Sequence, residues 1–199
     1  MANTDAPFGL RPVRTRNGSP WNGAATPYYC DAGYGTALYV GDPVVVVGDS
    51  NDNEIMGFSP GSLSQIEKAT AGDGNAITGV IVGFLPVTHE SLVYRAASTE
   101  RIAMVCDDPN VVFEIQSDGG SVTADTVGLN AVLIFTHAGS TVTGRSGVEL
   151  DTTSDTPDAD ASNQLLILAF SKGTEIGAYA KFDVLINQHT QAPGALGIA

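Results

Sequence analysis

The run Arg101-Ile-Ala-Met-Val-Cys-Asp-Asp-Pro-Asn-Val-Val-Phe-Glu-Ile-Gln116 contains two short apolar segments on either side of a polar break. Segments rich in Val, Ile and Phe are typical of buried β-strands. Asp and Pro in the break favour a tight turn, because Asp side chains accept hydrogen bonds from nearby backbone N–H groups and Pro presets φ. We therefore predict that residues 102–106 and 111–115 are adjacent antiparallel strands at the centre of the fold.

Further apolar runs continue outward from this pair, separated by turns rich in Gly, Pro and Asp. They predict about ten short strands, a number typical of a barrel, a sandwich or a jelly roll. One short helix is expected at residues 62–69, where Ser62 and Gln65 have the spacing of a helix N-terminus. A short strand is expected at residues 122–127. The predicted fold class is all-β: a jelly-roll-like domain, or a β-barrel or sandwich, with an extended N-terminal arm.

The chain divides into three predicted parts. Residues 1–26 contain Pro7 and Pro12, which disfavour a helix, together with several apolar side chains that would not suit a free tail. We expect an arm that lies in a groove of its own domain or of a neighbour, with an ordinary edge strand as the alternative. A single β domain is expected at residues 27–187, and a flexible tail at residues 188–199.

The chain is strongly acidic. Its net charge is −13, from 22 acidic and 9 basic residues. Nucleic-acid binding needs clustered Lys and Arg, so the composition argues against that class of partner. The first 20 residues differ, because Arg11, Arg14 and Arg16 stand against Asp5 alone, a net of 3 − 1 = +2. Such a basic arm on an acidic body would be steered towards an acidic partner surface.

The N-terminal sequence, the hydropathy and the cysteines indicate in which cellular compartment the protein is expected. The N-terminal residues lack the basic start and apolar run of a signal peptide. No stretch approaches the ~20 apolar residues of a membrane helix. We expect a protein that is made in the cytoplasm and has no membrane partner. Cys30 and Cys106 each lie in strand-like sequence and are expected to be buried free thiols, with a disulfide as the alternative.

Two segments imitate catalytic motifs. Residues 57–61 match Gly-x-Ser-x-Gly, but the residue after Ser59 is Pro60, which has no N–H to donate to an oxyanion. Residues 139–146 resemble a phosphate-binding loop, but strand-like sequence follows where that loop requires a helix. We predict loops at both places. No catalytic residue is assigned.

Metal and cofactor sites are not predicted either. Asp49, Asn51 and Asn53 have the alternate spacing of a calcium loop, but Glu54 and Pro60 occupy positions that require Gly and Glu. A loose surface calcium site there, or in the acidic loop at residues 151–162, is the alternative to a solvated loop. The three histidines lack metal-ligand spacing, and the Asp107-Asp108 pair is interpreted as turn chemistry.

Several segments resemble a family of small structural proteins from the virions of tailed phages. The resemblance covers nearly the whole chain except the acidic loop, and it is most specific at residues 107–116. The segments that carry it are residues 6–14, 17–20, 41–44, 79–86, 94–99, 107–116, 143–151 and 175–181.

The resemblance implies a capsid cement or decoration protein. Such a protein is a jelly-roll-like β domain, not an enzyme. It binds the major capsid protein on the outer surface of the head and holds neighbouring subunits together against the pressure of packaged DNA. Self-association into a dimer or trimer is expected, formed by pairing of exposed strand edges.

The arm is the predicted binding element for the capsid or for a neighbouring copy. Apolar anchors would fill pockets and guanidinium groups would pair with carboxylates. The residues assigned to this role are Phe8, Leu10, Arg11, Arg14, Arg16 and Trp21. The rival hypothesis is a β-sandwich virion module that binds host-surface glycans. Its aromatic platform would consist of Trp21, Tyr28, Tyr29 and Tyr34.

Overall fold

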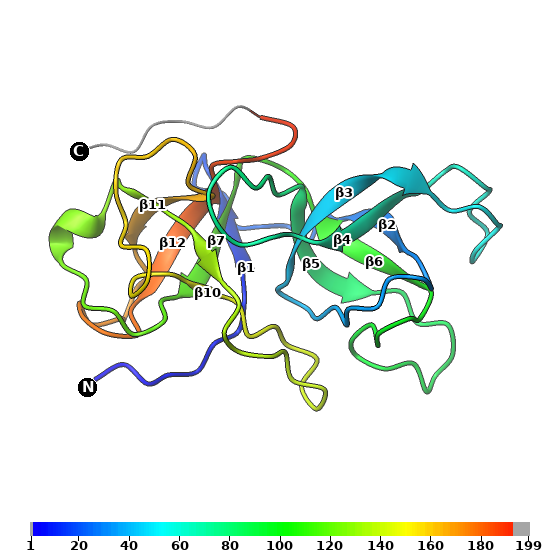
Figure 1. The fold of residues 1–199 in the computed structure, drawn as a ribbon, viewed down its shortest axis with the longest axis horizontal. Coiled ribbons are helices and arrows are strands. Elements are labelled where there is room, and N and C mark those ends of the chain that lie inside the picture. Colours follow the sequence, from blue (N-terminus) through cyan, green and yellow to red (C-terminus); the bar gives the residue numbers. More distant parts are fainter. Residues whose placement is uncertain (1, 193–199) are drawn as a thin grey trace.

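A closed five-stranded barrel and a five-stranded sheet lie side by side along the long axis of the molecule (Figure 1). The computed structural model describes residues 2–192. The barrel consists of β2 (Thr26–Cys30), β3 (Pro43–Ser50), β4 (Ser64–Lys68), β5 (Gly79–Phe84) and β6 (Arg101–Cys106). The sheet consists of β1 (Arg11–Thr15), β7 (Val111–Gln116), β8 (Asn130–Ala131), β11 (Leu165–Phe170) and β12 (Lys181–Ile186). The predicted all-β class is confirmed.

The order of the strands explains how each unit is built. The sheet runs β1-β7-β12-β11-β8, and all its pairs are antiparallel. The barrel runs β2-β4-β3-β5-β6 and closes because β6 pairs back onto β2. A separate pair, β9 (Leu133–Ile134) and β10 (Glu149–Leu150), completes the sheet unit.

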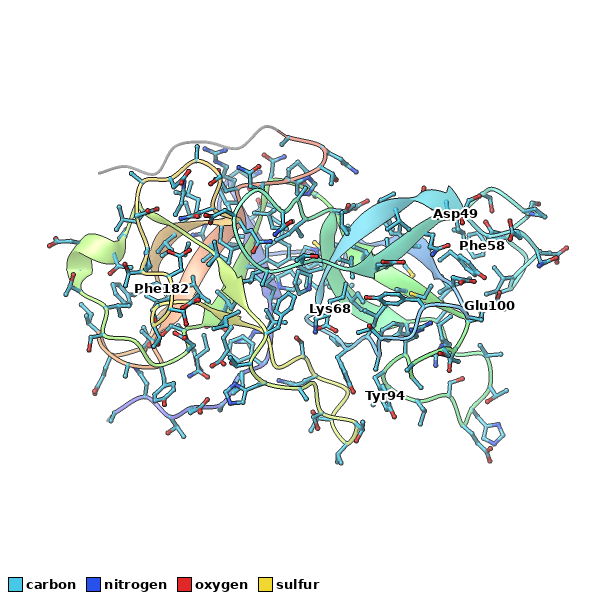
Figure 2. The ribbon with its side chains drawn as sticks, viewed as in Figure 1. Asp49, Phe58, Lys68, Tyr94, Glu100 and Phe182 are labelled. Carbon is cyan, nitrogen blue, oxygen red and sulfur yellow. The ribbon has the colours of Figure 1, made fainter. Side chains whose placement is uncertain are left out.

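One apolar core fills the sheet unit and extends onto the barrel. Phe113 and Phe182 are buried at its centre with Leu10 from the N-terminal arm, and Ile77 and Val80 reach it from the barrel side. Figure 2 shows Phe182 inside the sheet unit. A second cluster fills the barrel, with Ile66, Ile81 and Val105 among its members. Because the first cluster draws on both units, each depends on the other for burial of apolar surface.

The predicted central hairpin is wrong. β6 pairs with β2 and β5, whereas β7 pairs with β1 and β12. The turn between them does form, with Asn110 N–H bound to the Asp108 side chain over 2.8 Å. Both edges of β6 are already paired within the barrel, so β7 cannot pair with β6. After the turn, the chain therefore continues into the second sheet. The apolar pattern identified two strands correctly, but it carries no information about which edges they share.

Two further local predictions are corrected. Residues 62–69 contain β4 instead of a helix, because Ile66 is fully buried opposite Val46 of β3 and tertiary pairing outweighs the weak helix propensity of this short run. Ser62 donates its hydroxyl to the Ser59 carbonyl instead of capping a helix. Residues 122–127 contain a short 3-10 helix (η1, Ala124–Thr126), whose first turn is closed by a bond from Thr123 N–H to Thr126 Oγ1.

Both outer edges of the sheet are covered by the chain itself. At β1, residues 20–21 return alongside the strand, with a bridge between Arg14 and Pro20 and a 3.3 Å bond from Trp21 N–H to the Val13 carbonyl. At β8, Asn130 and Asp158 exchange backbone bonds of 2.6 and 3.0 Å. The strand edges on which the predicted dimer or trimer depends are therefore occupied in the single chain.

The two cysteines are buried free thiols, as predicted. Cys30 pairs in register with Arg101 at the start of β6, whereas Cys106 is the last residue of β6. The thiols therefore lie at opposite ends of the barrel, and no disulfide can join them. Burial raises the pKa of each thiol to about 12.

Candidate docking surfaces

The structure brings four of the six predicted arm residues into one place. Phe8, Leu10, Arg11 and Trp21 line a groove of about 320 Å³ between the arm and the barrel. Leu10 itself is buried in the sheet core, so its side chain is already used for folding. We call this the arm groove.

The predicted arm arginines have different surroundings. Arg11 forms an ion pair with Glu114 of β7, and its guanidinium carbon lies 5.0 Å from the centre of the Phe8 ring. Arg14 lies 3.4 Å from Asp183 of β12. Arg16 is exposed at the end of β1. Arg11 and Arg14 therefore hold β1 to its own sheet, and only Arg16 presents a guanidinium away from the fold.

The arm groove is apolar and basic. Strand β5 supplies Ile81 and Val82 to its walls, Val40 comes from the segment before β3, and Arg145 comes from the loop at residues 137–147. None of its ten lining residues is acidic, although the chain has 22 acidic residues. Within residues 2–192 no carboxylate forms a salt bridge with Arg145, which is exposed. The groove therefore presents an unpaired guanidinium beside an apolar surface.

A buried polar network fixes the loop that carries Arg145. Asp42 is fully buried and receives hydrogen bonds from Ser146 Oγ at 2.6 Å and from Tyr39 N–H at 2.8 Å. Lys68 Nζ lies 3.0 Å from the same carboxylate, and its ammonium also lies 4.8 Å from the centre of the Phe135 ring. Figure 2 shows Lys68 at the junction of the two units. The network ties β4 and two loops together at the base of the groove.

A second surface consists of exposed apolar side chains on two neighbouring loops. Residues 2–192 expose eight large apolar side chains, and four of them lie here: Val87, Leu92, Val93 and Val142. Val142 is 88% exposed, the largest value among the eight. We call these four residues the apolar loop face. In Figure 1 both loops extend from the same side of the molecule.

Backbone contacts hold the two loops together. Leu38 bridges to Arg95 after the first loop, and Val40 bridges to Arg145 in the second, so a single short segment joins them. A Cβ placed on Gly144 would lie 2.8 Å from the Val93 carbonyl oxygen, which shows how closely the loops approach. The apolar loop face is therefore one surface built on a shared base.

Two buried arginines fix the base of the first loop. Arg95 is fully buried, and its guanidinium donates to the carbonyls of Thr36 at 2.6 Å and Thr99 at 2.7 Å. Burial lowers the pKa of Arg95. Arg101 donates to the Leu85 carbonyl at 3.2 Å. Because a guanidinium presents several donors in a fixed plane, each arginine orders several backbone groups at once.

A stacked tyrosine pair joins the two loops below the apolar loop face. The ring centres of Tyr39 and Tyr94 are 5.2 Å apart, with an angle of 14° between the planes. Tyr39 also lies against the second loop, since a Cβ on Gly139 would fall 2.2 Å from its ring. Figure 2 shows Tyr94 on the side of the barrel from which both loops extend. The pair gives the loops a rigid support.

A histidine and a buried glutamate lie beside the arm. His137 Nδ1 is 2.7 Å from Glu149 Oε2. The hydrogen bond with Glu149 raises the pKa of His137, whereas burial raises the pKa of Glu149. His189 is buried, and burial lowers its pKa. His89 is exposed. His137 therefore supplies a hydrogen-bond partner to a buried carboxyl group beneath the second loop.

The aromatic platform of the glycan hypothesis does not form. Tyr28 and Tyr29 are buried, and their hydroxyls donate to Asp107 and Glu100 at 2.9 and 2.8 Å. Burial raises the pKa of Tyr28 to about 12 and also raises that of Tyr29. Trp21 packs against the sheet core, whereas Tyr34 packs against the barrel core with the Arg95 guanidinium over its ring. The four aromatic rings therefore offer no common exposed face.

The segments that imitate other motifs are ordered loops. The backbone carbonyl of Ser59 accepts hydrogen bonds from the side-chain amide of Asn51 and the hydroxyl of Ser62. In the acidic loop, Asp151 is buried and its carboxylate accepts the N–H groups of Thr153 and Ser154. Within residues 2–192 no three His, Cys, Asp or Glu side chains come together as a group that could hold a metal ion. Among the same residues, no helix is long and apolar enough to cross a membrane.

The most accessible side chains of the arm groove and of the apolar loop face were not predicted from the sequence. Val142 and Arg145 both lie in the segment that imitates a phosphate-binding loop, which points to no docking role, and Val93 lies in a segment without a motif. Their shared location follows from bridges between positions far apart in sequence, which local patterns do not reveal. An exposed Val between polar residues is the one local signal that Val142 offers.

Comparison with known proteins adds no assignment. No family model, no curated protein and no solved structure matches this chain.

Proposed function

We propose that this protein is a structural component of a tailed-phage virion. It binds the outside of the major-capsid-protein shell and cements neighbouring subunits. The support for the virion setting is the resemblance of residues 107–116 and the other segments to phage decoration proteins. The support for docking is the apolar loop face, where half of the large exposed apolar side chains of residues 2–192 gather.

The proposal assigns shell contact to the apolar loop face and not to the arm. Leu10 is part of the protein core, and Arg11 and Arg14 already form ion pairs within the chain, so these side chains are less available to the shell than the unpaired apolar loop face. Leu92 and Val142 are exposed on a rigid base, which lowers the entropy lost when they become buried at an interface. Segments 85–95 and 137–146 hold a single acidic residue, Glu90, so the face also avoids repulsion from an acidic shell.

A pelleting assay tests this proposal. Capsids that lack the protein are mixed with increasing amounts of it, sedimented, and analysed for bound copies at several salt concentrations. Saturation at a fixed ratio is expected, with weak salt dependence because the contact is mainly apolar. The double variant Leu92→Ser/Val142→Ser should lose at least about tenfold in affinity, as expected when interface anchors are removed.

The control variant is Ile176→Ser. Ile176 is 58% exposed but lies on a different loop, so its substitution should leave binding unchanged. Absence of saturable binding by the unsubstituted protein at every salt concentration would refute the virion proposal. Equal loss in the control and in the loop-face variant would refute the assignment of the binding surface.

A further inference from the structure

A strained turn projects an apolar side chain from the far end of the barrel. Ile55 and Phe58 exchange backbone hydrogen bonds of 3.1 and 2.9 Å around Met56 and Gly57. The φ values of the two central residues are +50° and +85°. Such turns strongly prefer Asn, Asp or Gly at the first central position, because a Cβ is crowded at positive φ. Met56 occupies that position nonetheless and is 46% exposed.

The turn is held rigidly by its surroundings. Ile55 and Phe58 pack against a small apolar cluster at the end of the barrel. Asn51 is buried, and its side chain bonds the carbonyls of Asn53 and Ser59 and the N–H of Leu63, each at 2.9 Å. Met56 is therefore presented in a fixed position, which is the property expected of a binding anchor.

The charge around this turn is the opposite of that in the arm groove. Asp49, Asp52 and Glu54 are all exposed near Met56. The arm groove has Arg145 without a salt-bridge partner among the described residues, apolar walls and no acidic lining residue. Its volume of about 320 Å³ leaves space for an unbranched side chain such as that of methionine.

The two features cannot meet within one chain. Figure 2 shows Phe58 and Asp49 at the far end of the barrel and Lys68 at the junction of the units. Lys68 pairs with Asp42, and Gly41, the residue before Asp42, lines the arm groove. We propose that the Met56 turn of one copy docks in the arm groove of a second copy, with Met56 against the apolar walls and Glu54 paired with Arg145. This contact is independent of shell binding.

The proposed contact is heterologous, since it joins two different surfaces. Such contacts build rings where the rotation between copies closes, and open chains where it does not. Strand-edge pairing is not required, in agreement with the covered edges of β1 and β8. An otherwise acidic protein can therefore self-associate through a basic groove that attracts its acidic Met56 turn.

Sedimentation velocity of the purified full chain, from micromolar to millimolar concentration, tests the contact. The unsubstituted protein should show concentration-dependent association. Met56→Asn should weaken it by roughly 30-fold, the effect of removing a strong interface anchor. Because Asn is favoured at this turn position, the same variant should unfold at an equal or higher temperature, so a loss of association cannot be attributed to misfolding. Ile176→Asn serves as the control and should associate normally.

A charge exchange between two variants gives the sharper test. Glu54→Arg alone and Arg145→Glu alone should each be monomeric, because like charges would meet at the contact. Mixed in equal amounts, the two variants should regain association, because the Met56 turn of each variant then meets an arm groove of opposite charge on the other variant. An unsubstituted protein that stays monomeric at the highest concentration, or a mixture that stays monomeric, would overturn the proposal. Shell binding in the pelleting assay does not bear on either outcome.

Discussion

Ser146 Oγ donates a 2.6 Å hydrogen bond to Asp42 Oδ1, although the two residues are 104 positions apart in the chain. The carboxylate that receives it is fully buried and also binds Lys68. The bond joins the loop that carries Arg145 to the barrel, so the geometry of the arm groove depends on a buried charge that is paired on several sides.

Replacement of Asp42 by Ala should destabilise the protein by about 3–5 kcal/mol, the usual cost of leaving a buried partner charge unpaired. Urea unfolding at neutral pH measures this. Ser146→Ala should cost less, about 1–3 kcal/mol, because one neutral donor is lost. The double variant Asp42→Ala/Lys68→Met should recover part of the loss, since the orphaned ammonium is removed. Equal urea midpoints for Asp42→Ala and the unsubstituted protein would contradict the buried network.

Replacement of Gly9 by Ala should be far more damaging than replacement of Gly18. Both glycines have positive φ, at +74° and +91°, so Ala should cost about 1–2 kcal/mol in either place through backbone strain alone. A Cβ on Gly9 would also lie 2.5 Å from the Gly41 carbonyl oxygen, whereas nothing lies within 4 Å of one on Gly18. The difference between the two unfolding free energies therefore measures how tightly the arm crosses the barrel. Similar values for both variants would disprove the close crossing.

Stability should fall as the pH drops below about 6.5 because of His189. Burial lowers its pKa in the folded protein, so the folded state holds this imidazole neutral while the unfolded chain, with an ordinary pKa near 6.5, takes up a proton. The unfolded state then binds more protons, and stability decreases from about pH 6.5 down to the lowered folded pKa. Thermal unfolding at pH 7.5 and 5.5 should show a smaller drop for His189→Gln than for the unsubstituted protein. An identical drop would refute this origin.

Neither thiol should react in the native protein. The pKa of Cys30 and Cys106 is raised to about 12 by burial, and the thiolate is the reactive form. Ellman's reagent at pH 8 should label neither cysteine in the native state and both after addition of denaturant. Rapid labelling of one cysteine without denaturant would show that its end of the barrel opens.

Several strands were predictable because short apolar runs flanked by turn residues mark them in the local sequence. The apolar runs that became β6 and β7 were predicted from their content of Val, Ile and Phe and from the turn residues between them. Their neighbours were not, since β6 and β7 are buried on both faces and no alternation distinguishes one partner from another. The error at residues 62–69 has the same origin. Ile66 is buried because it pairs with β3, and the sequence around Ile66 does not indicate that pairing.

The candidate surfaces were predicted less well, for a physical reason. Phe8, Leu10, Arg11 and Trp21 have side chains that suit an interface, but the same chemistry also suits the protein interior. Leu10 completes the core and Arg11 secures β1, while Arg145, which was not predicted to belong to a binding surface, is the exposed guanidinium of the groove. The tail was predicted at residues 188–199. Its first part is bonded to the fold, since Ile77 exchanges backbone hydrogen bonds with Gln188 and Thr190, and residues 193–199 lie outside the described residues.

The covered sheet edges also matter for how the protein tolerates crowding. Because the outer sides of β1 and β8 already form backbone bonds with residues 20–21 and 158, the sheet as described over residues 2–192 presents no long row of unpaired amides at these edges where another chain could start cross-β stacking. Copies concentrated in a small volume are then protected from amyloid-like growth at these edges. Assembly depends instead on side-chain contacts, which are reversible.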